Sequence, residues 1–209
     1  MTREEKLHEK FVLLSSFEIE AKSKGFLFCA GIDEAGRGPL AGPVVAAACI
    51  LDENVPIYGL DDSKKLSEKR REELYEEIIV KASAFSVVRV EPDRIDEINI
   101  LEATKLAMRV CVKNLSLQPD LLLIDAVNLT GTGVEVLPII KGDAKSNSIA
   151  AASILAKVSR DRIMREYDLQ YPGYGFAKHK GYGTPEHYAA IQVLSLCPIH
   201  RRTFLKGYC

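Results

Sequence analysis

Four acidic residues stand where carboxylates could do chemistry. Asp33 and Glu34 follow the apolar run FLFCAGI, Asp125 closes the run LLLI, and Asp143 precedes a long helical segment. A carboxylate at the end of a buried strand is costly unless it is paired or binds a cation. If the fold brings these acids to one sheet edge, their oxygens would hold a hard divalent ion, either Mg²⁺ or Mn²⁺.

The residues around these acids narrow the chemistry. No histidine is near any of the four in the sequence, which disfavours zinc, and no serine or cysteine nucleophile motif accompanies them. Two divalent ions roughly 3.5–4 Å apart can activate a water and stabilise the leaving oxygen in a phosphoryl displacement. Any one of these acids alone would more often cap a helix or end a strand. The prediction therefore rests on all four acids together with the loop that follows the first two.

The elements that must position the acids form a mixed α/β pattern. Strands that end on an acid alternate with amphipathic helices, which favours a mixed sheet with helices packed on it. The predicted strands cover residues 26–33, 44–51, 85–91, 121–127 and 134–140. The predicted helices cover residues 3–22, 68–82, 98–115, 146–168 and 184–196.

Length and composition are those of an ordinary globular protein. The 209 residues, 47% apolar and 27% charged, fit one domain. No apolar run is long enough to span a bilayer, and the start, MTREEKLHEK, lacks the apolar core of a secretion signal. Five scattered cysteines without a CxxC pair argue against a disulfide framework and for a reducing cytoplasm.

Charge is unevenly distributed along the chain. Residues 1–140 hold 17 Lys and Arg against 24 Asp and Glu, whereas residues 141–209 hold 11 against 5, although the whole chain has a net charge of only −1. A basic C-terminal portion on an acidic body can steer a polyanion to one face. Chance clustering on solvated helices explains the same numbers equally well.

A glycine-rich loop follows the first two acids. Residues 31–48 read GIDEAGRGPLAGPVVAAA, with glycines that permit positive φ and close backbone approach. The loop is not a P-loop, because no GxxxxGK[ST] pattern is present. Its exposed backbone groups could hold a phosphate and a sugar hydroxyl, although a loop of this kind alone more often marks a turn.

Several stretches together resemble the ribonuclease HII family, the type 2 ribonucleases H of bacteria. The glycine-rich stretch resembles the N-terminal signature of that family. Its later motifs are resembled, in the same order, by DSKKLS (62–67), LLIDAVN (122–128), KGDAKSNSIAAASILAKVSRD (141–161) and GYGFAKHKGYGTPEH (173–187). The similarity covers roughly residues 26–190. No recognisable motif covers residues 1–24 or the tail after 196.

The resemblance implies a fold and roles for individual residues. The implied fold is ribonuclease H-like: one catalytic domain over residues 1–209, with a mixed five-stranded sheet flanked by helices and a helical C-terminal part from about residue 170. The four acids would hold two Mn²⁺ or Mg²⁺ ions. The motif formed by Gly36, Arg37 and Gly38 would contact the ribonucleotide 2′-hydroxyl through its backbone.

Other substrate contacts are implied in the same way. Lys64 and Lys65 resemble phosphate-contacting lysines. Tyr182 resembles the tyrosine that packs on the sugar of the following deoxynucleotide, although Tyr174 lies in a similar GYG context and stays open as the alternative. Ser146 and Ser148 are predicted to be N-caps of the long helix.

Four further residues, two on the long helix and two in the loop after it, have competing interpretations. Lys157 and Arg160 would either reach substrate phosphate, or lie on a solvated face or pair with Asp161. For His179 and Lys180 a surface loop is the favoured interpretation, and a role in handling substrate or product is the alternative.

The implied activity is endonucleolytic cleavage of the RNA strand of RNA–DNA hybrids and on the 5′ side of single ribonucleotides in DNA duplexes, leaving a 3′-hydroxyl and a 5′-phosphate. The chain is expected to act alone in the cytoplasm, without a membrane. Ribonuclease HIII is a rival, disfavoured by the GRG sequence at 36–38. The rivals of other classes are a silent hybrid-binding module and a small-molecule phosphohydrolase.

Overall fold

A five-stranded sheet forms the centre of the protein in the computed structural model, which describes residues 1–125 and 127–208. The strands lie in the order β3-β2-β1-β4-β5. Their bounds are β1 (Cys29–Ala35), β2 (Val44–Ile50), β3 (Ala84–Val90), β4 (Leu121–Asp125) and β5 (Glu135–Ile139).

The sheet is mixed, as the sequence predicted. β2 pairs antiparallel with both β1 and β3, whereas β4 pairs parallel with both β1 and β5. In the parallel pair, Ile32 lies opposite Ile124, so the next residue on each strand is an acid, Asp33 or Asp125. The carboxyl ends of these two central strands therefore bring acids from distant parts of the chain to one edge.

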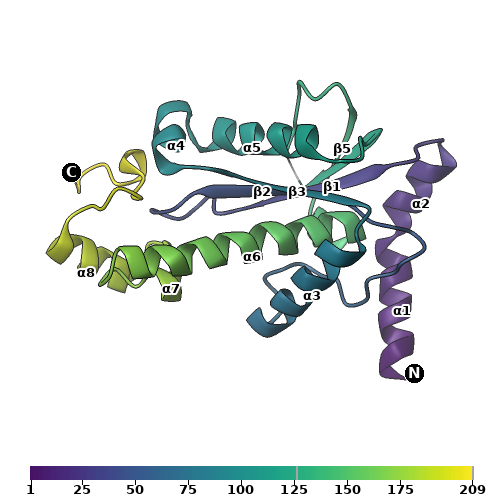
Figure 1. Cartoon of the computed structure of the whole chain (residues 1–209), viewed down its shortest axis with the longest axis horizontal. Coiled ribbons are helices and arrows are strands. Elements are labelled where there is room, and N and C mark those ends of the chain that lie inside the picture. Colours follow the sequence, from purple (N-terminus) through teal and green to yellow (C-terminus); the bar gives the residue numbers. More distant parts are fainter. Residues whose placement is uncertain (126, 209) are drawn as a thin grey trace.

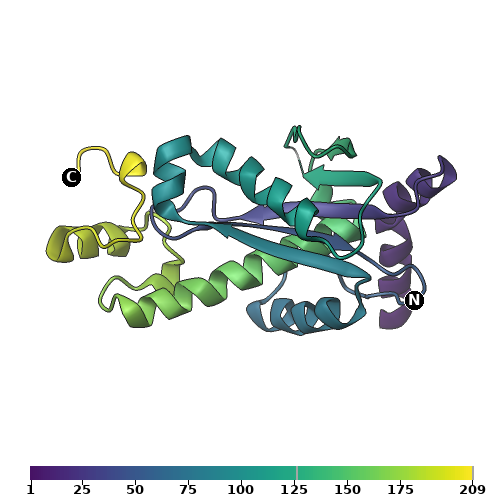
Figure 2. The same cartoon turned by 45° about the horizontal axis from the view of Figure 1, so that its top comes forward.

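Helices cover both faces of the sheet (Figures 1 and 2). α5 lies on one face, and α3 and α6 lie on the other. The α-helices are α1 (Arg3–Leu14), α2 (Ser16–Ser23), α3 (Glu68–Lys81), α4 (Pro92–Ile98), α5 (Ile100–Asn114), α6 (Asn147–Gln170), α7 (Phe176–His179) and α8 (Pro185–Leu194). The short 3₁₀ helices are η1 (Gly142–Ala144) and η2 (Arg202–Phe204).

Small residues bring α6 close to the sheet. A Cβ atom on Gly31 would lie only 2.0 Å from the carbonyl carbon of Ser148, so only glycine fits at this point of β1. Ala150, Ala151 and Ala152 on the same helix are fully buried. This close packing fixes the start of α6, and with it the preceding turn that carries Asp143.

One predicted helix is divided in two, and another begins two residues later than predicted. The helix predicted over 3–22 is broken at Ser15, whose hydroxyl donates to the carbonyl of Phe11 at 2.9 Å. The helix predicted from residue 98 is preceded by the unpredicted α4, which Pro92 opens. Asn99 separates α4 from α5 with a φ of 67° and caps α5 with its side chain, a conformation that asparagine tolerates.

The first predicted strand begins later than the apolar pattern indicated. The backbone N–H groups of Leu27 and Phe28 donate to the Asp120 carboxylate at 2.7 and 2.9 Å, and β1 starts only at Cys29. β1 also ends later than predicted, at Ala35, so that Glu34 as well as Asp33 lies inside the strand.

The N-terminal helices dock on the body through polar contacts. Oε1 of Glu18 accepts hydrogen bonds from the Ser146 hydroxyl at 2.6 Å and from the Ser148 N–H at 3.0 Å. The side-chain amide of Asn147 donates to the carbonyl of Phe11 at 2.8 Å. These contacts hold α1 and α2 against the start of α6.

Two further predictions concern the whole chain. Within residues 1–125 and 127–208, no helix is both long and apolar enough to cross a membrane. The four described cysteines (Cys29, Cys49, Cys111 and Cys197) are free thiols, and Cys209 lies outside the described residues.

Candidate active site

The four predicted acids come from three neighbouring elements. β1 carries Asp33 and Glu34, β4 ends at Asp125, and η1 carries Asp143. Asp33 and Asp143 are buried, with 7% and 8% of their surface exposed. A single sheet edge and the turn before α6 thus gather residues that are up to 110 positions apart in the sequence.

The acids influence one another's protonation. Burial raises the pKa of Asp33 well above its usual range, and the charges of Glu34 and Asp125 raise it further. Burial also raises the pKa of Glu34, against the opposing effect of Arg37. For Asp143, burial and the neighbouring Asp62 and Asp125 raise the pKa. The common direction comes first from burial and then from repulsion between carboxylates that lie near one another.

Hydrogen bonds orient individual oxygens of this acid cluster, which comprises Asp33, Glu34, Asp125 and Asp143. The N–H of Glu34 donates to Oδ1 of Asp33 at 2.8 Å, and the N–H of Gly142 donates to Oδ1 of Asp125 at 2.9 Å. The second bond ties the turn that carries Asp143 to the end of β4. Oε2 of Glu34 is buried and accepts no hydrogen bond from any described residue.

The acid cluster is open rather than closed. Among the residues that the structure describes, no three His, Cys, Asp or Glu side chains converge tightly enough to enclose an ion. The donor set is entirely carboxylate, which suits hard ions such as Mg²⁺ and Mn²⁺.

The glycine-rich loop lies beside the acid cluster. Nη1 of Arg37 is 3.3 Å from Oε1 of Glu34, so this side chain faces the acids. Gly36 has a φ of +94°, and a Cβ atom there would lie 2.0 Å from Nε of Arg160, so no other residue fits. Gly38 is open to space except for Tyr182, whose Cε1 would be 3.7 Å from an added Cβ.

The structure separates the two candidate tyrosines. Tyr182 is 47% exposed and lies beside Gly38. Tyr174 is buried, and its hydroxyl donates to the carbonyls of Leu194 and Ser195. Only Tyr182 therefore presents its ring on the side of the glycine loop.

The two predicted lysines differ in their surroundings. Both are exposed, and the charge of Lys64 lowers the pKa of Glu34 and of Asp143, which places it next to the acid cluster. Nζ of Lys65 instead lies 3.5 Å from Oδ1 of Asp61. Lys64 is thus the better placed of the two for a phosphate at the acids.

Sequence reasoning missed two residues at the acids. Asp62, in the DSKKLS stretch, shares a hydrogen bond with Asp143 that raises the pKa of the latter, after the larger effects of burial and charge. Ser153 on α6 offers a hydrogen bond that lowers the pKa of Asp33, against the larger effect of burial. The position of Asp62 beside two predicted lysines was an available signal, whereas Ser153 carried none.

Among the residues with competing interpretations, Lys157 is settled as an ion pair, because its Nζ lies 2.6 Å from Oδ1 of Asp161. Both interpretations of Arg160 are wrong, since it is 1% exposed and donates to three backbone carbonyls. Ser146 caps α6 as predicted by accepting from the N–H of Ile149, whereas Ser148 lies inside the helix.

The loop interpretation of His179 is also incomplete. His179 is half-buried at the end of α7 and stacks on His187, with ring centroids 4.5 Å apart. Nδ1 of His187 donates to the carbonyl of Tyr182 at 2.9 Å, because a carbonyl can only accept. Its Nε2, 3.1 Å from Nε2 of His200, is then the acceptor of that second bond. The histidines hold the segment that carries Tyr182.

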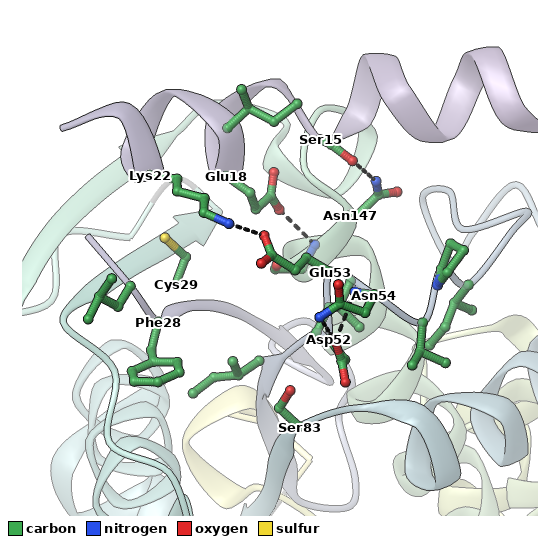
Figure 3. A pocket seen from close by; sticks show the side chains of 18 of the residues that line it. Ser15, Glu18, Lys22, Phe28, Cys29, Asp52, Glu53, Asn54, Ser83 and Asn147 are labelled. Carbon is green, nitrogen blue, oxygen red and sulfur yellow. Dashed lines mark hydrogen bonds and ion pairs between the residues drawn. The ribbon is translucent and has the colours of Figure 1, made fainter. Parts of the chain in front are cut away.

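A separate pocket lies at the opposite end of β1 (Figure 3). It has a volume of about 430 Å³ and is lined by residues of α2, the loop after β2 and the start of α6, among them Glu18, Cys29 and Asn147. Cys29 precedes Asp33 by four residues, about 13 Å along an extended strand. None of the four acids lines this pocket.

Comparison with known proteins decides the family. The family model described as Ribonuclease HII matches residues 30–206. The chain belongs to the ribonuclease HII family. It is 54% identical over 200 residues to Ribonuclease HII of Ruminiclostridium cellulolyticum, covering 96% of this chain and 78% of that protein. It is 55% identical over 204 residues to Ribonuclease HII of Acetivibrio thermocellus, covering 98% and 80%.

Solved ribonuclease HII structures share the fold. Ribonuclease H2 of Pyrococcus horikoshii superposes with a TM-score of 0.73 at 29% identity, covering 87% of this chain and 97% of that one. Ribonuclease HII of Archaeoglobus fulgidus, solved in complex with PCNA, gives 0.71 at 31% identity, covering 84% and 94%. The predicted resemblance and the ribonuclease H-like fold are confirmed, and as a ribonuclease HII the chain is an endoribonuclease of RNA–DNA hybrids.

Proposed function

We propose that this ribonuclease HII cuts on the 5′ side of single ribonucleotides in duplex DNA as well as in longer hybrids, by two-metal-ion hydrolysis that leaves a 3′-hydroxyl and a 5′-phosphate. The observation that carries the proposal is the position of the glycine loop, which is joined to the acid cluster through Arg37 and Glu34 and flanked by the exposed ring of Tyr182. The whole chain, residues 1–209, would act as one catalytic domain.

The acid cluster would hold the ions. Bound Mn²⁺ or Mg²⁺ would supply an activated water and stabilise the charge on the leaving oxygen. Glu34 offers Oε2, a buried acceptor that no described residue satisfies. Asp125 offers Oδ2, since the backbone of Gly142 holds its Oδ1. A bound cation would also offset the mutual repulsion of these carboxylates.

The glycine loop and Tyr182 would recognise the ribonucleotide. The 2′-hydroxyl is the group that distinguishes RNA from DNA, and the backbone of Gly36, Arg37 and Gly38 would contact it without reading the base. Tyr182 would pack on the sugar of the following deoxynucleotide, and Lys64 would bind phosphate. All of these contacts are independent of base sequence, as cleavage at any position in a genome requires.

Cleavage of a DNA duplex with one embedded ribonucleotide tests the proposal. Wild type should cut on the 5′ side of the ribonucleotide when Mn²⁺ or Mg²⁺ is added, and should leave an all-DNA duplex intact. Asp125→Asn should reduce the cleavage rate at least about a hundredfold, because a neutral amide replaces a negatively charged ligand of the ions. Asp93→Asn is the matched control, because Asp93 is exposed and lies on α4.

Other outcomes point elsewhere. If folded wild-type protein cuts long hybrids but not the single-ribonucleotide duplex, the finer specificity proposed here is wrong. If it cuts neither with either metal and binds no divalent ion, a silent hybrid-binding module takes its place. Unchanged activity of Asp125→Asn would remove the acid cluster from the mechanism.

A further inference from the structure

Two buried arginines lie beneath the glycine loop. Arg160 on α6 is 1% exposed, and Arg201, in the segment between α8 and η2, is fully buried. Arginine is almost never fully buried unless its charge is paired. Neither guanidinium has a carboxylate within 4 Å among the described residues, so their partners must be sought in the backbone.

Arg201 is hydrogen-bonded to both ends of the loop. Its Nη2 donates to the carbonyl of Gly36 at 2.5 Å and its Nη1 to the carbonyl of Arg37 at 2.9 Å. Its Nε donates to the carbonyl of Gly42 at 2.9 Å. The backbone N–H of Arg201 also donates to the carbonyl of Leu40 at 2.8 Å. One residue of the C-terminal segment thus fixes four carbonyls across the loop.

Arg160 grips the loop from α6. Its Nε and Nη2 donate to the carbonyls of Pro43 and Ala41 at 3.0 and 3.1 Å. Its Nη1 donates to the carbonyl of Lys180 at 3.0 Å, two residues before Tyr182. Arg160 therefore links the glycine loop to the segment that carries the exposed tyrosine.

Both side chains remain charged at neutral pH. Burial lowers the pKa of Arg160 to about 10 and that of Arg201 to about 9, and both values lie above 7. Burying two neighbouring cations without carboxylate partners is costly, and apolar side chains would fill the same volume at less cost. A destabilising arrangement of this kind is expected at functional sites.

The direction of the carbonyls determines what the loop presents. In a trans peptide the C=O and the following N–H point in opposite directions, and the described chain has no cis peptide bond. Arg201 holds the carbonyls of Gly36 and Arg37 toward itself, so the N–H groups of Arg37 and Gly38 point to the opposite side of the loop. These are donors suited to a hydroxyl or phosphate oxygen.

We propose that Arg160 and Arg201 are positioning residues that hold the glycine loop with its carbonyls inward and its N–H groups toward the ribonucleotide. The C-terminal segment would thereby become part of ribonucleotide recognition, although it never touches the substrate. This inference rests on the proposed role of the loop, but the anchoring of the loop is measurable without any substrate.

Arg201→Lys is the first variant, because it keeps the charge but replaces a planar fork of donors by one compact ammonium. Arg202→Lys is its matched control, being the adjacent and exposed arginine. Arg160→Lys tests the second anchoring arginine and replaces Arg201→Lys in the experiments if that variant fails to fold. Cooperative thermal unfolding establishes that each variant is folded.

Hydrogen exchange of the backbone amides tests the anchoring without substrate. In Arg201→Lys and Arg160→Lys, the amides of Leu40 and Gly42, which donate to the carbonyls of Gly181 and Ile199, should exchange at least about tenfold faster than in wild type, whereas amides of α5 should not change. Arg202→Lys should match wild type throughout. If the loop amides of both Arg201→Lys and Arg160→Lys exchange at the wild-type rate, the proposal is wrong, whatever substrate the enzyme cleaves.

Cleavage kinetics test the role in recognition. On the single-ribonucleotide duplex, Arg201→Lys should lower kcat by about tenfold or more while KM changes little, since phosphate contacts dominate duplex binding. Activity of Arg201→Ala should recover partly with added guanidinium but not with methylammonium. A loss confined to KM, or wild-type kcat in a variant with a loosened loop, would refute the positioning role. Failure of wild type to cut this duplex would refute the proposed function instead.

Discussion

The fold places Asp33 in surroundings that disfavour its ionised form. Burial first, and then the neighbouring Glu34 and Asp125, raise its pKa, so the folded protein binds this proton more tightly than the unfolded chain does. Stability conferred by the protonated form is fully present below the unfolded pKa and is lost as pH rises through the folded one. At neutral pH without a divalent ion, Asp33 therefore destabilises the folded protein, because the unfolded chain releases this proton more readily.

Asp33→Asn should accordingly be more stable than wild type at pH 7 in a chelator, because the amide removes the repulsion and can still accept from the N–H of Glu34. We expect a gain of about 1 kcal/mol or more, which is about 2–4 °C in Tm for a chain of this size. Differential scanning calorimetry measures it. Added Mn²⁺ should raise the Tm of wild type and not that of the variant, and Asp93→Asn should follow wild type. A lower Tm for Asp33→Asn in chelator would contradict this account.

At the scale of elements, the C-terminal helices depend on neutral histidines. Burial lowers the pKa of His187 to about 4, and burial also lowers the pKa of His200. The unfolded chain takes up a proton at His187 near pH 6.5, whereas the folded chain resists until about pH 4. The stability of this region is therefore complete above pH 6.5 and is lost as pH falls from 6.5 toward 4.

His187→Gln should flatten that pH dependence, since glutamine is neutral throughout. Above pH 7 the variant should be less stable than wild type by about 1–3 kcal/mol, because bonds to Tyr182 and His200 are disturbed. Unfolding followed between pH 5 and 8 measures both effects. His8→Gln is the control, as His8 is exposed. An equally steep loss below pH 6.5 in His187→Gln would show that other groups cause it.

For the whole molecule, the uneven charge predicts strongly salt-dependent binding of nucleic acid. Each lysine that neutralises a phosphate contributes about 0.9 to the slope of log affinity against log salt. Lys64→Gln should lower this slope by about 1, because Lys64 is exposed beside the acid cluster. Lys65→Gln should lower it less, because Lys65 already faces Asp61. Titrations by fluorescence anisotropy at several salt concentrations compare the two variants. Equal effects would show that Lys65 leaves Asp61 for phosphate.

The sequence by itself determined the class of fold, the four acids and the glycine loop. Asp33, Glu34 and Asp125 stand at the ends of apolar runs, and the loop has its glycines and prolines in a fixed order, whereas Asp143 stands in the KGDAKS stretch before a helical segment. Such local patterns involve only residues that are close together along the chain, so the sequence alone reveals them. For the same reason the cap at Ser146 was predictable, whereas the break at Ser15 was masked by continuous helical periodicity.

Only the tertiary structure decided what lies behind the loop and which tyrosine faces it. Arg160 and Arg201 bind carbonyls 117 to 165 positions away, apart from the bond to Lys180. In a sequence such arginines are indistinguishable from solvated ones. Asp62 meets Asp143, and Tyr182 rather than Tyr174 is exposed, for the same reason. Burial and partnership are properties of chain crossings, and no local pattern records where the chain will cross.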